Sequence, residues 1–409
     1  MKIVRDQMLD FSNLGHPDVR ADPYPFYTRL REQDPVHWDE ELGFWVLTRY
    51  ADIAAAYHDP RFSRAQGLRG GFERLPEAEQ IVAEPVYRSF SKTMFYSDPP
   101  YHTRLRGLVN NAFTPAAVEQ MQIYIQQTVD DLLDRVQGQH RMDVIHDFAY
   151  PLPILVIAHM LGLPAEDRIH FKQWSDDLFA ILGSVPHATE LMERAAHSLH
   201  ELTNYITELS NARRAHPKED LLTALVEAVE DGERLTQEEL VANVIILLSA
   251  GHETTSNLIG NGLFALLQHP EQLQLLRNQP RLVASAVEEM MRYDNPVQIA
   301  YRSATQDVEV GGKCIQKGQL VNSILAAGNR DPARFSEPDR FDITRNEGRH
   351  LGLGLGIHFC LGAPLLRLEA QIAFRTLLQR LPEMALATEN LEWQEHPIFR
   401  GVKSLPVMF

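Results

Sequence analysis

Cysteine is scarce in this sequence of 409 residues, which contains only Cys314 and Cys360. Two cysteines at separate positions do not form a disulfide framework, and they exclude a zinc site built from several cysteines. We interpret Cys314, within residues 311–315, as a small buried apolar side chain. No Pro-, Gly- or Ser-rich linker, repeat or low-complexity block divides the chain. Residues 1–409 are therefore expected to form a single domain.

Long apolar runs and an excess of positive charge are also missing. The longest apolar run, Val241 to Gly251, contains Asn243 and is shorter than the ~20 apolar residues that cross a bilayer. Residues 1–6 include no apolar segment typical of a signal peptide. The formal net charge of −16 disfavours nucleic acid as a partner. We expect a cytoplasmic protein without a membrane anchor.

The stretch from residue 351 to residue 362, called the Cys loop below, carries the strongest chemical signal. Alternating glycines precede His358 and Cys360, and Pro364 suits the first turn of the apolar helix that follows. This pattern predicts Cys360 on a tight loop beside a helix N-terminus, where the helix dipole favours a thiolate. Such a thiolate is a metal ligand or a nucleophile. The glycine spacing does not fit a dinucleotide-binding fingerprint, whereas a zinc site with His358 and Cys360 stays open.

A second pattern predicts one long buried helix over residues 236–269. Thr236 and Glu239 form a capping box at its start, and His269-Pro270 ends it. At 1.5 Å per residue, roughly thirty residues span ~45–50 Å, enough to cross the molecule. Residues 250–255 break the apolar pattern with a glycine, an acid and two threonines. This break is either a satisfied polar kink or a functional site.

Two shorter motifs place charged residues on one helix face. His102 and Arg106 lie four residues apart after Asp98-Pro99-Pro100, and Glu289 and Arg292 lie three apart. Taken alone, each pair is most often a solvated surface feature, worth roughly a few tenths of a kcal/mol. Their order along the chain makes them informative.

Together these motifs resemble the cytochrome P450 family, in the same order, from residue 98 to residue 362. The Cys loop is similar to the haem-binding pattern F-G-x-G-x-H-x-C-x-G, with Leu353 in place of phenylalanine. Residues 250–255 match A-G-x-E-T-T, and Glu289 and Arg292 match E-x-x-R, a buried structural ion pair in the family. The resemblance implies a mainly α fold with small β-sheets (α+β). It also implies a triangular, helix-rich domain with haem between the long helix and the helix after the Cys loop.

The resemblance also implies roles for single residues. Cys360 is the metal-binding residue, as the thiolate ligand of haem b (iron protoporphyrin IX). Gly251 leaves room for dioxygen, and Glu253 and Thr254 deliver protons. The residues that contact the haem propionates are His102, Arg106, Arg302 and His358. How Leu353 tunes the iron stays open.

The implied activity is that of a haem-thiolate monooxygenase that hydroxylates or epoxidises a lipophilic small molecule with O2. The chain has no flavin fingerprint and no cysteine set for an iron–sulfur cluster, so a separate ferredoxin- or flavodoxin-type donor with its reductase must supply electrons. We expect a monomer that binds this donor on a positive face formed by Arg104, Arg106, Arg349 and Arg367. A peroxide-driven peroxygenase and a non-enzymatic haem-binding or sensor protein are the alternatives, and the Glu253–Thr254 pair disfavours both.

The substrate pocket implied by the resemblance is mostly apolar, with His252 or Arg400 as a polar contact. Its expected lining residues are Met94, Phe95, Ala250, Val297, Ile299, Ala300 and Phe399. Residues 60–97 show little periodicity and are predicted to form a long loop over this pocket. Residues 36–48 predict a β-hairpin, and residues 308–323 predict further strands. Weak patterns near 162–190 are expected to form mobile connections that cap the channel.

Overall fold

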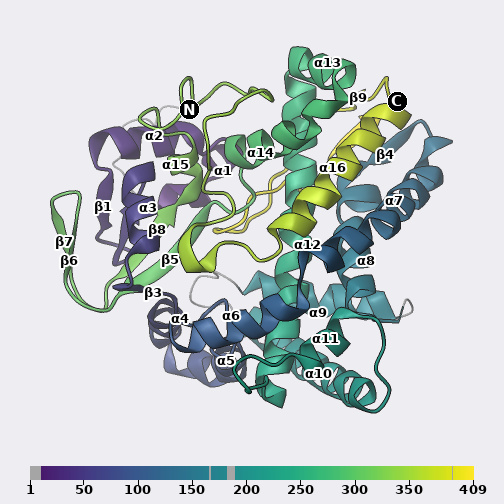
Figure 1. Cartoon of the computed structure of the whole chain (residues 1–409). Helices are drawn as coiled ribbons and strands as arrows, with labels where there is room; N and C mark the ends of the chain where they lie inside the picture. The colour runs from purple at the N-terminus through teal and green to yellow at the C-terminus, as the bar shows by residue number, and fades with distance from the viewer. Residues whose placement is uncertain (1–10, 165–166, 182–188, 389) are drawn as a thin grey trace.

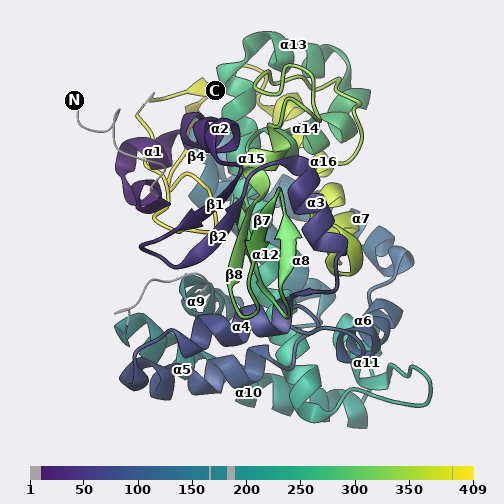
Figure 2. The ribbon, with the colours of Figure 1, turned by 90° about the vertical axis from the view of Figure 1, so that its left-hand side faces the viewer.

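The computed structural model describes residues 11–164, 167–181, 189–388 and 390–409 (Figure 1). Helices dominate, and a small β-sheet lies to one side of them, which confirms the expected mainly α class (Figures 1 and 2). The long helix α12 (Gln237–Gln268) runs through the middle of the molecule, and other helices pack around it.

The helices that precede α12 are α1 (Pro17–Ala21), α2 (Tyr24–Gln33), α3 (Tyr50–His58), α4 (Arg64–Glu73), α5 (Glu77–Phe90), α6 (Tyr101–Ala112), α7 (Pro115–Gln137), α8 (Pro151–Met160), α9 (Arg168–Ala180), α10 (Thr189–Ala215) and α11 (Leu221–Glu227). Those that follow it are α13 (Pro270–Asn278), α14 (Val283–Tyr293), α15 (Leu325–Asn329) and α16 (Ala363–Arg380). A π-helix, η2 (Val144–Ala149), and the short 3-10 helices η1 (Phe11–Gly15), η4 (Pro280–Leu282) and η5 (Gly356–His358) complete the helical part.

The largest sheet pairs strands from residues 36–63 with strands from residues 299–324. Its strands, in spatial order, are β1 (Val36–Asp39), β2 (Phe44–Leu47), β8 (Leu320–Ile324), β5 (Ile299–Ala304) and β3 (Phe62–Ser63). β1 and β2 form the predicted hairpin, with Val36 opposite Leu47. A second sheet contains β4 (Arg141–Asp143), β10 (Pro406–Met408) and β9 (Ala385–Leu386), and β6 (Val308–Val310) pairs with β7 (Lys313–Ile315). Because β5 lies at the cavity described below, the five-stranded sheet forms one wall of the site.

Helix α12 has the predicted capping box. The Glu239 N–H donates to Thr236 Oγ1 at 3.2 Å, and the Thr236 N–H donates to Glu239 Oε2 at 2.9 Å. Asn243, the polar residue within the apolar run, is fully buried but satisfied. Its Oδ1 accepts from the Met94 N–H at 2.9 Å, and its Nδ2 donates to the Lys92 carbonyl at 3.1 Å. This side chain therefore fastens the pocket segment around Met94 to the central helix.

Two glycines of α12 are expected to respond in opposite ways to alanine. A Cβ at Gly262 would lie 2.6 Å from Met290 Sδ and 2.9 Å from Phe374 Cζ. Gly262→Ala is therefore expected to destabilise the protein by about 1–3 kcal/mol through overpacking. A Cβ at Gly251 would lie 3.7 Å from Ile157 Cγ1, an ordinary contact, so Gly251→Ala is expected to stabilise by about 0.5–1 kcal/mol through helix propensity. Denaturant unfolding of the two holoproteins measures the difference, and a destabilised Gly251→Ala protein would contradict the packing described here.

Three sequence predictions need correction or restriction. Residues 60–97 are not a long loop, since α4 and α5 occupy most of the segment. Glycines at 67, 70 and 71 hid the first of these helices, and Gly67 is needed because a Cβ there would lie 3.1 Å from the Arg302 Cα. Cys314 is exposed on β7, not buried. Within the predicted connections near 162–190, residues 165–166 and 182–188 lie outside the described residues, and Arg168–Ala180 between them form α9.

Candidate active site

A cavity of about 280 Å³ lies between the middle of α12, the Cys loop, the start of α16 and the sheet. Gly251 and Thr254 line it from α12, and His358 and Cys360 line it from the Cys loop. The seven residues predicted to line the pocket all line this cavity: Met94, Phe95, Ala250, Val297, Ile299, Ala300 and Phe399. Motifs far apart in the sequence thus meet at one site.

The glycines of the Cys loop shape the turn that presents Cys360. Gly354 and Gly356 have φ values of +69° and +65°, which disfavour other residues. A Cβ at Gly356 would also lie 2.8 Å from the Tyr57 carbonyl oxygen. The Cys360 N–H donates to the carbonyl of Leu353, which is buried and lines the cavity, at 2.9 Å. The loop is therefore closed by its own backbone, and the thiol is held at the cavity wall.

The electrostatics of Cys360 correct one expectation. Burial raises the pKa of the Cys360 thiol above its ordinary value, and this outweighs the lowering by the Gly362 and Ala363 N–H groups and by Arg106 and Arg367. The start of α16 is therefore not sufficient to make a thiolate at neutral pH. A cation bound at the sulfur would supply the missing stabilisation.

A cluster of cationic side chains lies beside the thiol. His102 and His358 place their ring centroids 4.3 Å apart, and Arg106 donates to the Phe359 carbonyl at 3.0 Å. Burial, followed by the charges of neighbouring cations, lowers the pKa of His358 to about 2. Those neighbours are Arg64, His102, Arg302 and Arg106. Asp98 is an acidic partner of His102 and Arg302, but basic side chains outnumber it here. Such an excess of basic groups is typical of an anion-binding site.

Two members of this cluster carry donors that lack acceptors. His102 Nε2 and one terminal nitrogen of Arg302 are buried and have no hydrogen-bond partner among the residues that the structure describes. Arg302 is only 5% exposed and stacks on the Tyr57 ring, 3.6 Å from its centroid. Buried donors are nearly always paired in native proteins, so these two indicate a bound anion. A pair of carboxylates would satisfy them.

The hydroxyl-rich part of α12 stays α-helical. Thr254 Oγ1 donates to the Ala250 carbonyl at 2.9 Å, and Ser256 Oγ donates to the His252 carbonyl at 2.9 Å. Glu253 does not line the cavity; it is 8% exposed, and its Oε1 accepts from Gln394 Nε2 at 3.0 Å. The acid is thus held just behind the threonine that faces the cavity.

The Glu289–Arg292 motif is a buried ion pair, as the resemblance implies, and not the surface pair that such a motif most often forms when taken alone. Arg292 Nε and Glu289 Oε2 are 2.7 Å apart, with side-chain exposures of 2% and 1%. Arg292 also donates to the Asn329 and Pro338 carbonyls at 2.9 and 2.7 Å. Arg345 completes the group, with its Nε 3.2 Å from Glu289 Oε2. This network fastens the segment before the Cys loop to α14.

Two expected polar contacts of the pocket are wrong. Arg400 points away from the cavity and donates to Asp294 Oδ1 at 2.7 Å and to the Arg20 carbonyl at 2.6 Å. His252 is a buried residue of α12 and does not line the cavity. The sequence reasoning missed Glu369, which does line the cavity and whose pKa is raised by burial. Its place in the ordinary amphipathic pattern of α16 gave no signal.

The predicted arginine face is also only partly positive. Arg104 pairs with Glu239 and lies 3.3 Å from Glu233, and Arg367 Nε donates to Glu288 Oε1 at 2.6 Å. Arg106 lines the cavity. Arg349 remains exposed. The acids that neutralise this face come from distant parts of the chain, which local sequence patterns do not reveal.

A buried cysteine on an apolar cavity, a cationic cluster with unsatisfied donors and a helix that presents threonine beside an acid define the site of a haem-thiolate monooxygenase. The family model of cytochrome P450 matches residues 76–382, and the chain belongs to this family. It is therefore a P450 monooxygenase that binds haem b through a cysteine thiolate. Among the described residues, no helix combines the length and apolar character needed to cross a bilayer.

Similar proteins match along nearly the whole chain. The biotin biosynthesis cytochrome P450 of Bacillus subtilis is 41% identical and covers 97% of this chain and 99% of its own. The cytochrome P450 monooxygenase PikC of Streptomyces venezuelae is 43% identical, with coverages of 98% and 94%. The crystal structure of P450BioI with a hexadec-9Z-enoic acid-ligated acyl carrier protein has a TM-score of 0.89 at 40% identity. It covers 96% of this chain and 99% of that chain.

Proposed function

We propose that Cys360 would bind the iron of haem b as a thiolate and that His102, Arg106, Arg302 and His358 would hold its propionates. The cationic cluster with two unsatisfied buried donors is the observation that carries this assignment. We add Arg64 of α4 to the cluster, because its charge also lowers the pKa of His358. When bound, the haem supplies an iron centre that activates dioxygen with two electrons.

We infer that Thr254 and Glu253 manage the protons of this reaction and that Gly251 leaves room for the oxygen. Thr254 lines the cavity, and its hydroxyl can exchange the Ala250 carbonyl for a ligand in the cavity by rotation about χ1. Glu253 directly precedes Thr254 and is buried, and Gln394 and Asn257 donate hydrogen bonds to one of its carboxylate oxygens. An intact acid–threonine pair favours oxygen over peroxide as the oxidant, since peroxide brings its own protons.

The substrate that fits this cavity best is a lipophilic small molecule, which we propose is hydroxylated or epoxidised. Most lining side chains are apolar, from Met94 and Phe95 on one segment to Val297 and Phe399 on others. A related structure, 42% identical with a TM-score of 0.87, is described in complex with myristic acid. Myristic acid is therefore the first probe of choice. Electrons would come from a separate ferredoxin- or flavodoxin-type donor, and action in the cytoplasm as a monomer stays a prediction.

Thr254→Ala tests the proposed function. The variant is expected to keep haem and to bind myristic acid as the wild type does, because the Thr254 hydroxyl bonds to the Ala250 carbonyl of its own helix and not to another element. Product formed per electron pair is expected to fall at least about tenfold, with hydrogen peroxide formed instead, because proton delivery is impaired. Spectral titration and the ratio of product to reductant consumed measure the two effects.

Ser256→Ala is the matched control for this experiment. Ser256 makes the same kind of hydrogen bond, to the His252 carbonyl at 2.9 Å, but is buried and does not line the cavity. Its coupling is expected to match the wild type. Equal coupling in Thr254→Ala would remove Thr254 from the proton path, and a wild-type spectrum unchanged by myristic acid would contradict the proposed substrate class.

A further inference from the structure

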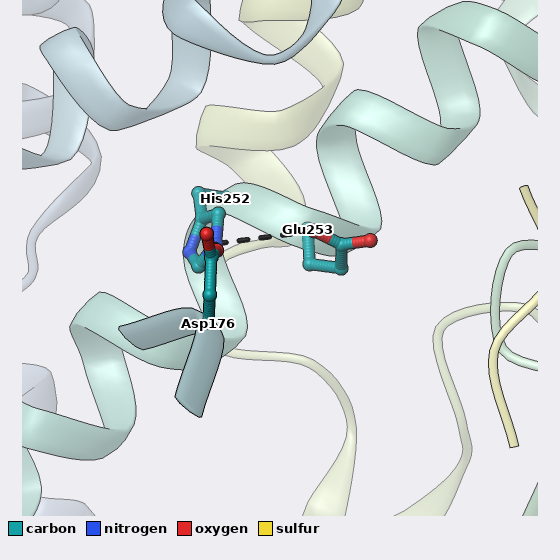
Figure 3. Close-up of side chains that lie close together, drawn as sticks. All are labelled: Asp176, His252 and Glu253. Carbon is teal, nitrogen blue, oxygen red and sulfur yellow. Dashed lines mark ion pairs between the residues drawn. The ribbon is translucent and has the colours of Figure 1, made fainter. Parts of the chain in front are cut away.

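Three titratable side chains meet behind the cavity, on the side of α12 that faces α9 (Figure 3). His252 Nε2 lies 3.5 Å from Asp176 Oδ1 and 3.9 Å from Glu253 Oε2. Asp176 comes from α9, whereas the other two are neighbours on α12. The cluster therefore bridges two helices and ends at the acid next to Thr254.

The orientation of the His252 ring decides what this cluster can do. His252 Nδ1 lies 3.2 Å from the Leu248 carbonyl, four residues back on the same helix, and 3.4 Å from Ser175 Oγ. A carbonyl accepts only, so the Nδ1 proton stays in place to donate to it. The remaining nitrogen, Nε2, is the atom that faces both carboxylates. It can gain a proton from one and lose it to the other without a change of tautomer.

The two carboxylates differ in their access to water. The side chain of Asp176 is 36% exposed, whereas those of His252 and Glu253 are 2% and 11% exposed. Tyr150 also donates to Asp176 Oδ1. Burial and the charge of Asp176 raise the pKa of Tyr150, so its hydroxyl stays protonated. Among the described residues, His252 thus faces Asp176 from α9, Tyr150 from the start of α8 and Glu253 from α12 itself. Of the two carboxylates, Asp176 is the more exposed.

We propose that Asp176 and His252 form the outer half of a proton path that ends at Glu253 and Thr254, an inference that rests on the function proposed above. In one cycle, Asp176 takes a proton from water and passes it to His252 Nε2. The imidazolium then gives that proton to the Glu253 carboxylate and returns to its neutral form with Nδ1 protonated. One proton thus moves from water to Glu253, whose carboxylate becomes a neutral acid able to give it to Thr254, while Asp176 and His252 return to their starting charges. Because 3.5 Å is longer than an ordinary hydrogen bond and 3.9 Å is longer still, each transfer needs a side-chain rotation or one bridging water.

The proposed proton path crosses from α9 to α12 and therefore requires contact between these two helices. Its first member lies on α9 and its second on α12, so it is continuous only while these helices are packed together. Gln394 Nε2 and Asn257 Nδ2 donate to Oε1 of Glu253 and leave Oε2 for the histidine. His252 and Asp176 are positioning and proton-transferring residues, since neither lines the cavity.

His252→Gln and Asp176→Asn test the inference in the holoenzyme, with myristic acid and a surrogate ferredoxin and reductase. Both variants are expected to lower kcat at least about tenfold with KM nearly unchanged, because the slowed step follows binding. The solvent deuterium isotope effect on kcat is expected to rise. Asp176→Glu keeps a carboxylate and is expected to restore most of the rate.

Asp177→Asn is the matched control, because this buried acid is the next residue on α9 but binds Arg194 and Ser198 instead. It is expected to leave the isotope effect unchanged. A second readout does not depend on turnover: the 15N NMR signal of His252 Nε2 in the diamagnetic reduced carbon monoxide complex. The chemical shift of this nitrogen is expected to change in Asp176→Asn, since the carboxylate that it faces at 3.5 Å is replaced by an amide.

Two results would overturn the inference. One is a His252→Gln enzyme with wild-type kcat and isotope effect, and the other is a His252 Nε2 chemical shift that Asp176→Asn does not change. Failure of the proposed function would look different, because the wild type itself would show no thiolate-ligated haem spectrum or no product. That result would remove both proposals before any variant is compared.

Discussion

Replacing Cys360 with serine is expected to abolish the thiolate-specific absorption band of the reduced carbon monoxide complex and to reduce monooxygenase turnover to background. Serine is nearly isosteric, so the loop closed by the Cys360 N–H and the Leu353 carbonyl is expected to persist. Its hydroxyl does not ionise near neutral pH, and an anionic sulfur is what favours O–O cleavage. The difference spectrum of the reduced protein with and without carbon monoxide measures the first effect, and product analysis measures the second.

Cys314→Ser is the control for that experiment, because Cys314 is exposed on β7. It is expected to behave as the wild type in spectrum and turnover. Retention of the thiolate band in Cys360→Ser would show that the sulfur ligand has been assigned to the wrong residue. The cationic cluster gives a separate check, since haem is expected to remain bound in Cys360→Ser through its propionates, although more weakly.

The parts of this molecule that the sequence predicts well are held together by near neighbours. The capping box of α12 joins residues three apart, and the turn of the Cys loop depends on glycines within the loop itself. Helix periodicity and turn chemistry act over the same short range, so the pattern and the structure agree. The hairpin of β1 and β2 follows for the same reason.

The errors on charged side chains come from contacts between distant residues. Arg367 was predicted to be a free positive charge, but it pairs with Glu288, which lies 79 residues away in the sequence. Arg400 was considered for the pocket, but it is bound by Asp294 and by backbone carbonyls of residues 20 and 21. No local pattern fixes such partners, because the fold decides which charges meet. Arg64 was missed for the same reason, since only the fold brings α4 to the cationic cluster.

The pKa of the Cys360 thiol illustrates how a correct local rule can be outweighed by burial in the protein without its cofactor. The N–H groups at the start of α16 do lower the pKa of the thiol, as the sequence suggested. Burial raises it by more, because a thiolate loses solvation within an apolar cavity. The balance depends on depth within the protein, which is a property of the whole fold. At this depth a Cys360 thiolate needs a bound cation to replace the solvation that it loses.

Glu289→Gln is expected to destabilise the holoprotein by about 3–5 kcal/mol, the cost of leaving buried charge without its partner. Glutamine keeps the volume of the side chain but removes the negative charge shared by Arg292 and Arg345. Those two arginine side chains are only 2% and 8% exposed, so water cannot replace the carboxylate. Denaturant unfolding at neutral pH measures the change in the free energy of unfolding.

The matched control is Glu337→Gln, because Glu337 also pairs with an arginine, Arg340, but both side chains are more than half exposed. Its expected cost is about 0–1 kcal/mol. The Glu289 variant is also expected to release haem faster, since Glu289 Oε1 accepts from the Asp342 N–H at 2.8 Å and so fixes the segment that leads to the Cys loop. A Glu289→Gln protein as stable as the Glu337 variant would mean that the two arginines find other acceptors. In that case the Glu289–Arg292 pair would not be what holds the Cys loop in place.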